Sequence, residues 1–391
     1  MTDKLTAQQK LKITVVFGTR PETIKLAPVI DKIKNEERLA LNTIVTGQHE
    51  EMLAQMLETF SLKPDYNLQL MQEQQSLADL TKRAVSRLDS VFQEITSDLV
   101  IVHGDTTTTF SAALSAFYHQ IPVAHVEAGL RSFDKYSPFP EEMNRQLTDT
   151  LADLYFAPTA ENKNNLLQEN IAPENIYVTG NTVIDAVKNI ADRDFNFSPS
   201  LQKIVKNREN KDILLLTAHR RENIGAKMKN IFSAMKKIID KFPRVEIVFP
   251  VHLNPAVQKI ARDELGGISR IHLLEPLDYK NFINLLAVST LVLTDSGGIQ
   301  EEAPALGIPV ILLRETTERP EAIEAGTVIR AGLNRGKIVE VTSRLLIDST
   351  FYRQIAETPN PYGDGKAADR IVQFIMSYFG YKKDKPEEFK L

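Results

Sequence analysis

The sequence predicts an α/β protein made of two doubly wound domains in tandem. Short apolar, β-branched runs are followed by polar or glycine-containing loops and then by apolar residues at helical spacing, and this unit recurs along the chain. Strands that alternate with helices favour parallel sheets covered on both faces. A second series of such units begins near residue 212 of the 391, a length that suits two or three domains.

The first domain is predicted to span residues 1–185. Three strands are expected in it, at residues 13–17, 99–102 and 122–126. Pro21 suits the first turn of the helix after the first strand, where its missing N–H costs nothing. A further helix is expected over residues 106–119. These alternating elements predict one parallel sheet.

The second domain is predicted to span residues 205–365. Its strands are expected at residues 213–216, 245–249, 291–294 and 309–313. The polar stretch 192–212 has little periodicity and is interpreted as a linker. Apolar residues at helical spacing predict a last helix near residues 371–378. The charged end, residues 382–391, is expected to be frayed.

Composition excludes several classes of function. Lys and Arg number 47 against 51 Asp and Glu, so the net charge of −4 argues against a nucleic-acid partner. The absence of cysteine excludes disulfides, thiolate catalysis and Cys-ligated metal sites. No apolar run approaches the roughly 18 residues of a membrane span, and the first residues are polar. A cytoplasmic protein without a membrane partner is therefore expected.

Two loops resemble each other. Each follows the first strand of its domain and carries Arg and Glu two residues apart, as Arg20/Glu22 and Arg220/Glu222. Ligands of open α/β sheets bind beyond the carboxyl ends of the strands, so two domains that face each other would direct both loops into one cleft. Lys25 follows Arg20 on the predicted helix, and both can reach an anion. The alternative is a solvated basic face.

Two carboxylates follow neighbouring predicted strands. Asp105 and Glu127 are expected to lie close together, which would raise one pKa and suit acid–base chemistry. The alternative for Asp105 is an N-cap of the helix that follows it. Glu141 and Glu142 precede another helix, and their alternative role is to complement its dipole.

A glycine-containing loop, Ser296-Gly297-Gly298, opens a helix after a predicted strand. Free N–H groups there favour phosphate, although Ser296 has the alternative role of an N-cap. Glu302, one turn further on, is either a ribose ligand or a surface acid. His219 and His252 follow predicted strands without metal-ligand spacing, and lone histidines are more often structural than catalytic.

The chain has neither a P-loop nor a Gly-x-Gly-x-x-Gly after a strand, which argues against a P-loop NTPase and a standard NAD enzyme. These patterns predict an anionic, phosphorylated ligand in the cleft. They do not identify the reaction.

Nine motifs span nearly the whole chain in a fixed order. They are Phe17-Gly-Thr-Arg-Pro-Glu22, His103-Gly-Asp-Thr-Thr-Thr-Thr109, His125-Val-Glu-Ala-Gly-Leu-Arg131, Pro138-Phe-Pro-Glu-Glu142, Thr179-Gly-Asn-Thr182, His219-Arg-Arg-Glu222, Pro250-Val-His-Leu-Asn-Pro255, Thr294-Asp-Ser-Gly-Gly-Ile-Gln-Glu-Glu302 and Thr317-Glu-Arg-Pro-Glu321. Together they resemble the non-hydrolysing UDP-N-acetylglucosamine 2-epimerases of bacteria.

The resemblance implies a glycosyltransferase-B-type fold, with two Rossmann-like domains facing a cleft and a C-terminal helix, about 366–391, that rejoins the first domain. It implies reversible conversion of UDP-GlcNAc to UDP-ManNAc by elimination of UDP and re-addition to a 2-acetamidoglucal. It further implies no cofactor, no metal, a homodimer, and a product used for cell-envelope polysaccharide.

The resemblance also assigns roles to matching residues. Those expected to act in catalysis are Asp105, Glu127, Glu141 and His219. Those expected to bind the substrate are Arg20, Lys25, Asp105, Glu127, His219, Leu277, Phe282, Ser296, Gly297, Gly298, Glu302 and Arg319. Those expected to bind a second UDP-GlcNAc as an allosteric activator are Gln48, Glu51, Arg83, Glu141, Arg220 and His252. Glu50 departs from the family pattern, which has Arg there, and an added acid would weaken activation.

Three alternatives remain at this point. A hydrolysing epimerase would release free ManNAc and UDP. A retaining glycosyltransferase of the same fold would need an acceptor. A non-catalytic sensor would bind UDP-GlcNAc without changing it, although the acids at 105, 127 and 141 argue against that.

Overall fold

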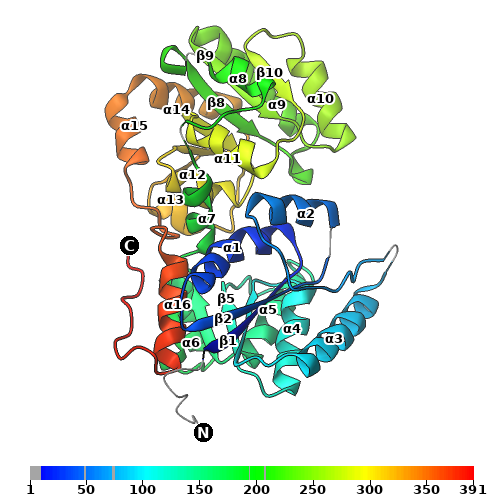
Figure 1. The fold of residues 1–391 in the computed structure, drawn as a ribbon. Helices are drawn as coiled ribbons and strands as arrows, with labels where there is room; N and C mark the ends of the chain where they lie inside the picture. Colours follow the sequence, from blue (N-terminus) through cyan, green and yellow to red (C-terminus); the bar gives the residue numbers. More distant parts are fainter. Residues whose placement is uncertain (1–9, 48–49, 73–74, 193, 207) are drawn as a thin grey trace. The chain divides into compact units, whose positions relative to one another are not determined.

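The computed structural model describes residues 10–391 apart from 48–49, 73–74, 193 and 207. It divides into two compact units, the first formed by the chain up to Ala186 together with Gly363–Lys390, and the second by Val187–Tyr362. Each unit contains one parallel sheet with helices on both faces (Figure 1). The predicted doubly wound α/β class is therefore confirmed. No helix in the described part of the chain is long and apolar enough to cross a membrane.

The first sheet has the strand order β3-β2-β1-β4-β5-β6-β7. Its strands are β1 Leu11–Phe17, β2 Leu39–Val45, β3 Tyr66–Asn67, β4 Leu99–His103, β5 Val123–Val126, β6 Leu154–Ala157 and β7 Ile176–Val178. Its helices are α1 Arg20–Lys34, α2 Glu50–Thr59, α3 Leu77–Glu94, α4 Thr107–Tyr118, α5 Glu141–Leu151, α6 Ala160–Gln168, α7 Thr182–Ile190, which continues into the second unit, and α16 Ala367–Tyr378, with a 3-10 turn at Pro173–Asn175.

Side-chain alternation along β1 divides the core of the first unit into two layers. Val15 and Phe17 point to the face covered by α1 and α16, whereas Val16 points to the face covered by α3 and α4 (Figure 1). Successive side chains of a strand point to opposite faces, so a continuous apolar run fills both layers. This explains why the strand reads as unbroken hydrophobic sequence.

The second sheet has the order β10-β9-β8-β11-β12-β13. Its strands are β8 Asp212–Thr217, β9 Val245–Pro250, β10 Ile271–Leu274, β11 Leu291–Thr294, β12 Val310–Leu312 and β13 Val328–Arg330. Its helices are α8 Pro199–Val205, α9 Ala226–Lys241, α10 Pro255–Leu265, α11 Tyr279–Ala287, α12 Ile299–Ala305, α13 Pro320–Glu324, α14 Arg335–Ile347 and α15 Ser349–Ala356, with 3-10 turns at Arg208–Asn210 and Arg221–Asn223.

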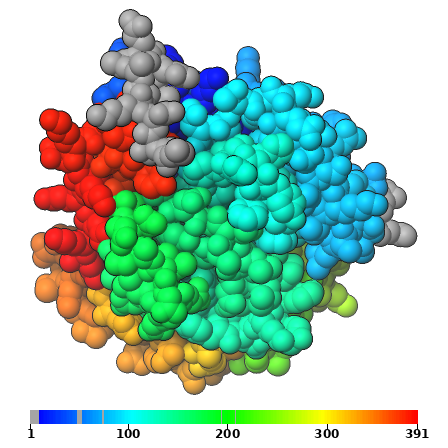
Figure 2. Space-filling model, turned by 90° about the horizontal axis from the view of Figure 1, so that it is seen from below, coloured from blue at the N-terminus to red at the C-terminus, as the bar shows by residue number. Residues whose placement is uncertain are grey.

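Two sequence predictions about connecting segments are wrong. The stretch 192–212, interpreted as a linker, contains α8, whose Leu201 and Ile204 are buried. The tail is not simply frayed, because the Phe389 N–H donates to the Val178 carbonyl (2.8 Å) at the edge strand β7, and Lys163 pairs with Glu388 (2.8 Å). Figure 2 shows this tail in red beside the green segment of the first unit. A sheet edge thus orders a segment whose own sequence has no periodicity.

Candidate active site

Each sheet has one point where the strand order reverses, and the candidate residues gather there. In the first unit it lies between β1 and β4, and in the second between β8 and β11. Loops that leave the carboxyl ends of strands on either side of such a point diverge and leave room for a ligand. The loops after β1 and β4 carry Arg20 and Asp105, and those after β8 and β11 carry His219 and Ser296.

A buried carboxylate holds the loop after β1. Glu22, which is 2% exposed, accepts hydrogen bonds from the Gly18 N–H (2.9 Å) and the Thr19 N–H (2.7 Å). It also accepts from the hydroxyls of Thr106 (2.6 Å) and Thr109 (3.0 Å), beside the loop after β4. Burial raises the pKa of Glu22 above its ordinary value. Glu22 therefore connects the segments that carry Arg20 and Asp105. Its hydrogen bonds stabilise these two segments.

Glu127 lies directly after β5 in a left-handed backbone conformation, with φ of +68°. Its carboxylate contacts Lys25 Nζ (2.5 Å) and Asn181 Nδ2 (3.1 Å), and lies 3.2 Å from His103 Nε2. A non-glycine residue at positive φ is costly, and such strain is concentrated at functional sites. Since the Lys25 ammonium is paired with Glu127, the solvated-face alternative for this lysine is wrong.

His103 is buried beside the Glu127 carboxylate. Burial lowers the pKa of His103 to about 3, so the ring is neutral near pH 7. Neither ring nitrogen has a partner with hydrogen-bond geometry, although Nε2 lies 3.2 Å from the carboxylate. A neutral, buried imidazole thus packs against the Glu127 carboxylate.

The low pKa of His103 makes a testable contribution to acid sensitivity. Between about pH 3 and 6.5 the unfolded chain binds this proton and the folded chain does not, so the free energy of unfolding falls as the pH is lowered. We expect His103→Gln to reduce that pH slope by up to about 1.4 kcal/mol per pH unit. Urea unfolding between pH 4 and 6 measures it, with His119→Gln as control at a more exposed histidine. Equal slopes in wild type and His103→Gln would contradict the prediction.

Asp105 does not cap the helix that follows it, so that alternative is wrong. The N-cap of α4 is Thr106, whose hydroxyl accepts from the Thr109 N–H. The Asp105 carboxylate, 28% exposed, instead forms a short ion pair with Arg145 on α5. The Asp105 carbonyl accepts from Asn144 Nδ2 (2.9 Å), so α5 holds this residue in two ways.

The two acids at the start of α5 differ in their surroundings. Glu142 is fully buried and accepts from the backbone N–H groups of Ser132 (2.9 Å) and Phe133 (3.2 Å), and from Arg145 (3.0 Å). Burial opposes its ionisation, but these donors lower the pKa of Glu142 below its ordinary value. Glu141, the first residue of the helix, is only half-buried. Of the two, Glu141 is the acid available to a ligand.

A buried ion pair supports the turn between His103 and Asp105. His125 is completely buried, with Nδ1 2.6 Å from Asp149 Oδ1 and Nε2 2.7 Å from the Gly104 carbonyl. Both partners are acceptors, and the two contacts fix the imidazole between Asp149 and the Gly104 carbonyl. Burial opposes ionisation of Asp149, but His125 and Arg131 hold its pKa below the ordinary value.

In the second unit, Asp295 organises the loops after β8 and β11. Its carboxylate is fully buried and accepts from the backbone N–H groups of His219 (3.1 and 3.0 Å) and Arg220 (3.0 Å) and from Asn223 Nδ2 (3.0 Å). His219 stacks on His252, with centroids 5.6 Å apart. Burial lowers the pKa of His219. Asp295 thus fixes the backbone of His219, and the His252 ring packs against its side chain.

The Ser296-Gly297-Gly298 loop precedes α12, but Ser296 is not its N-cap. Gly298 occupies that position, and no side chain caps it. A Cβ on Gly297 would stand 2.7 Å from Glu318 Oε1. The absence of a side chain at this position therefore leaves room for the Glu318 carboxylate beside the loop. Glu318 also pairs with Arg220 (3.0 Å).

The remaining substrate candidates of the second unit lie on or near α11 and α12. Tyr279 directs its hydroxyl towards Glu302 Oε1 (3.5 Å), and Arg319 forms an ion pair with Glu301. Leu277 and Phe282 are half-buried at the start of α11.

The allosteric candidates fall in both units. Arg83 on α3 donates to Gln72 Oε1 (2.8 Å) in the first unit, and Arg220 and His252 lie in the second. Gln48 lies outside the described residues, as does the side chain of Glu51, whose backbone belongs to α2.

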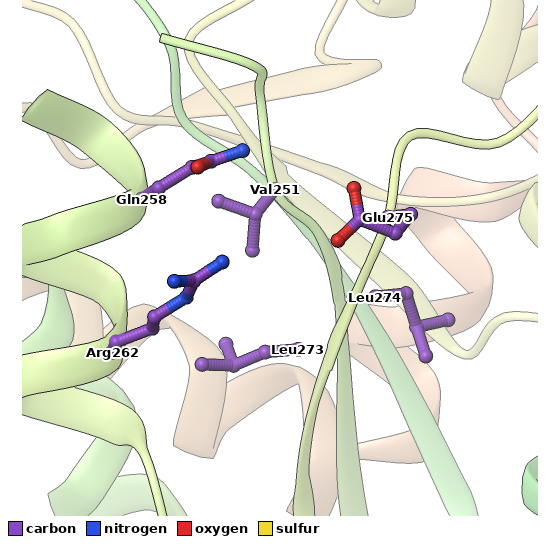
Figure 3. A pocket seen from close by; sticks show the side chains of 6 residues that line it. All are labelled: Val251, Gln258, Arg262, Leu273, Leu274 and Glu275. Carbon is purple, nitrogen blue, oxygen red and sulfur yellow. The ribbon is translucent and has the colours of Figure 1, made fainter. Parts of the chain in front are cut away.

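A separate pocket opens at the carboxyl ends of β9 and β10. Figure 3 shows Gln258 and Arg262 of α10 facing Val251 and Glu275 across it. Its volume is about 60 Å³, far below the roughly 300–1,000 Å³ of ligand pockets. None of the candidate residues lines it. By itself it cannot hold a nucleotide sugar.

These features define a class: two-domain α/β proteins of glycosyltransferase-B type, with polar side chains at the switch point of each sheet. The model of the family described as UDP-N-acetylglucosamine 2-epimerase matches residues 31–376. The chain belongs to this family of isomerases.

Individual relatives agree over nearly the full length. The UDP-N-acetylglucosamine 2-epimerase of Bacillus subtilis is 50% identical over 381 residues, which cover 97% of this chain and 99% of that protein. A crystal structure described as UDP-N-acetylglucosamine 2-epimerase has a TM-score of 0.91 at 48% identity, covering 98% of this chain and 100% of that chain. The Neisseria meningitidis enzyme bound to UDP-GlcNAc has a TM-score of 0.80 at 44% identity, covering 94% and 100%.

Sequence reasoning missed four residues of these clusters. His103, Asn181 and Arg145 contact the predicted acids, and Asp295 contacts His219. Two of them carried a usable signal, because His103 ends β4 and Asp295 directly follows β11, where parallel strands present ligands. Asn181 follows β7, a strand that the sequence did not predict, and Arg145 lies inside α5. Their contacts are with residues 54 and 40 positions away.

Proposed function

We propose that the protein catalyses the reversible, non-hydrolysing epimerisation of UDP-GlcNAc at C2 to UDP-ManNAc. A carboxylate removes the C2 proton as the C1–O bond breaks, the bonding electrons leave with UDP, and a C1=C2 double bond forms. Re-addition of UDP to C1, with protonation of C2 on the opposite face, gives the epimer. No redox cofactor or metal enters this scheme.

The observation that carries the proposal is the Glu127 carboxylate at the carboxyl edge of the first sheet. A strained backbone and the donors Lys25 and Asn181 hold it there. It lies over Gly104, since a Cβ on that glycine would stand 3.7 Å from Glu127 Oε2, and Asp105 is the next residue. Two carboxylates that follow adjacent parallel strands would supply an acid and a base, with Glu141 as the third proposed acid.

The second unit is proposed to bind UDP. Ser296, Gly297 and Gly298 would contact the diphosphate, Glu302 the ribose, and Leu277, Phe282 and Arg319 other parts of UDP. His219 would assist departure of the diphosphate, and Arg20 and Lys25 would contact the ligand from the first unit. The half-buried Glu302 beside the Tyr279 hydroxyl supports the ribose assignment, because a carboxylate can accept hydrogen bonds from several hydroxyl groups.

Removing the Glu302 carboxylate is expected to weaken UDP binding. Glu302→Ala would leave ribose hydroxyls unpaired, at a cost of about 1–3 kcal/mol. Isothermal titration with UDP measures the loss, and Glu340→Ala, at an exposed position on α14, is the matched control. UDP affinity within about twofold of wild type would instead assign Glu302 to the solvated helix surface.

The reaction is tested by NMR of UDP-GlcNAc with the purified protein in deuterated water. We expect UDP-ManNAc and deuterium at C2. Free ManNAc with stoichiometric UDP would indicate a hydrolysing epimerase. No turnover without an acceptor would indicate a glycosyltransferase, and binding without any change over hours a sensor.

Regulation and assembly extend the proposal. We propose that a second UDP-GlcNAc activates the enzyme through Gln48, Glu51, Arg83, Glu141, Arg220 and His252, and the same assay at varied substrate concentration would show a sigmoidal rate. Phe117 and Tyr118 are 56% and 62% exposed at the end of α4, which supports a homodimer that covers them. Action in the cytoplasm and supply of cell-envelope polysaccharide complete the proposal.

A further inference from the structure

Asp295 contacts the ring of His219 as well as its backbone. Its Oδ2 accepts from the N–H groups of His219 and Arg220 and from Asn223 Nδ2, each at 3.0 Å. Its Oδ1 lies 3.3 Å from His219 Nδ1. The carboxylate has no exposed surface, whereas the His219 side chain is 37% exposed. The ring therefore turns one nitrogen towards a buried carboxylate, and its other edge is open.

We propose that Asp295 is the positioning residue of His219: it selects the tautomer with the proton on Nδ1. Nε2 is then the nitrogen that takes up the next proton and, once protonated, donates to a phosphate oxygen of the ligand. A carboxylate only accepts hydrogen bonds, so a lone pair on Nδ1 would face a negative charge. The His219 N–H is shared between Oδ1 (3.1 Å) and Oδ2 (3.0 Å), and the other two donors reach Oδ2, so the carboxylate is fixed with Oδ1 beside the ring. The family resemblance assigns a role to His219 but none to Asp295.

The tautomer matters to the departing group, and this step rests on the proposed function. With Nδ1 already protonated, the next proton taken up by the ring goes to Nε2, where it can be donated to the phosphate oxygen that gains charge. The charged and titratable groups facing the ring are Asp295, Arg220, Glu222 and His252. His252 Nδ1 accepts from the Asn254 N–H (3.1 Å), so this nitrogen is not a donor to the carboxylate.

The test reads the tautomer directly, by long-range ¹H–¹⁵N spectra of the full ¹⁵N-labelled chain at pH 8. His219→Gln identifies the signal among the seven histidines. We expect a protonated Nδ1 in the wild type. In Asp295→Asn the amide oxygen can keep the Oδ2 position and its three donors, which places the NH2 group against Nδ1. The ring should then change to the Nε2–H tautomer.

Turnover provides the second measurement. We expect Asp295→Asn to reduce kcat by roughly 10²-fold or more, the effect of a wrong tautomer in carboxylate–histidine pairs. UDP affinity should stay within about threefold, because the contacts of the bound ground state remain. If Asp295 has only a structural role, Asp295→Asn should change kcat and UDP affinity together or leave both unchanged.

Asn223→Ala is the matched control, because it removes a donor to the same carboxylate and leaves Oδ1 beside the ring. It should keep the wild-type tautomer. An Nε2–H tautomer in the wild type, or an unchanged tautomer in Asp295→Asn, would overturn the inference. If the asparagine variant does not fold, the wild-type spectrum alone decides. If no epimerisation is found, the spectrum still reports on Asp295, so the two failures are distinguishable.

Discussion

Replacement of Asp105 by asparagine is expected to lower epimerase turnover by roughly 10²–10⁴-fold, the usual scale of general acid–base catalysis. The amide keeps the shape of the side chain, and its oxygen can still accept from Arg145. The helix that follows keeps its N-cap, which is Thr106. The fold and the affinity for UDP should therefore survive, and the loss should lie in kcat.

The matched control is Asp98→Asn, at the end of the same sheet where the strands begin. Asp98 precedes β4, is half-buried, and its carboxylate accepts from the Lys12 N–H (2.7 Å) at the start of β1. This variant replaces a half-buried, hydrogen-bonded carboxylate by its amide without touching the candidate site. Near-normal turnover of the Asp105 variant, with both proteins equally stable to urea, would leave Glu127 and Glu141 as the working acids.

The alternation of apolar strand, loop and helix was enough to predict the fold class. Seven predicted strands all occur, because each is a run of buried residues that a helix-spaced segment follows. The strands at the sheet edges were not predicted. β3 has two residues, and β7 and β13 have three each, like β12, which was predicted from the longer apolar run 309–313. β6 and β10, with four residues each, were also missed. β2 is longer, but Asn42 at its centre interrupts the apolar run.

The apparent parallel between Arg20/Glu22 and Arg220/Glu222 shows the limit of sequence reasoning at the site. Glu22 is a buried acceptor for its own loop, whereas Glu222 is exposed. In the second unit the same task falls to Asp295, which accepts from the Arg220 N–H across 75 residues of sequence. Spacing along the chain reveals local contacts. The position of Asp295 directly after a strand could mark it as a candidate, but its contact with Arg220 follows only from the assembled sheet.

Residue type could identify the acids, but their burial separates the roles. Glu141 and Glu142 are adjacent and chemically equivalent, yet one is fully buried among backbone donors and the other is accessible. The helical position decides this, because successive residues of α5 point about 100° apart. Similarly, no pattern predicted the positive φ of Glu127. Its N–H and the N–H of Ala128 both donate to the Phe156 carbonyl on the neighbouring β6, at 3.1 and 3.2 Å.

Replacement of Glu127 by glutamine is expected to be equally damaging, with a loss of roughly 10²–10⁴-fold in turnover. The amide oxygen can keep Lys25 and Asn181, and the NH2 group would then face His103, whose neutral ring can accept. The ammonium nevertheless loses its counter-ion, so we expect a stability loss of about 1–3 kcal/mol. Urea unfolding measures that loss, and the NMR assay measures turnover.

Glu246→Gln separates loss of chemistry from loss of an ion pair in the Glu127 experiment. The Glu246 carboxylate also contacts a lysine and a histidine, Lys211 at 3.3 Å and His272 at 2.6 Å, and its side chain is 14% exposed against 12% for Glu127. It lies at the start of β9, whereas the candidate residues follow the ends of strands. We therefore expect a similar loss of stability and unchanged turnover. If both variants keep their turnover, Glu127 only neutralises Lys25, and its strained backbone conformation serves that contact. If only Glu127→Gln loses turnover, the Glu127 carboxylate takes part in the reaction.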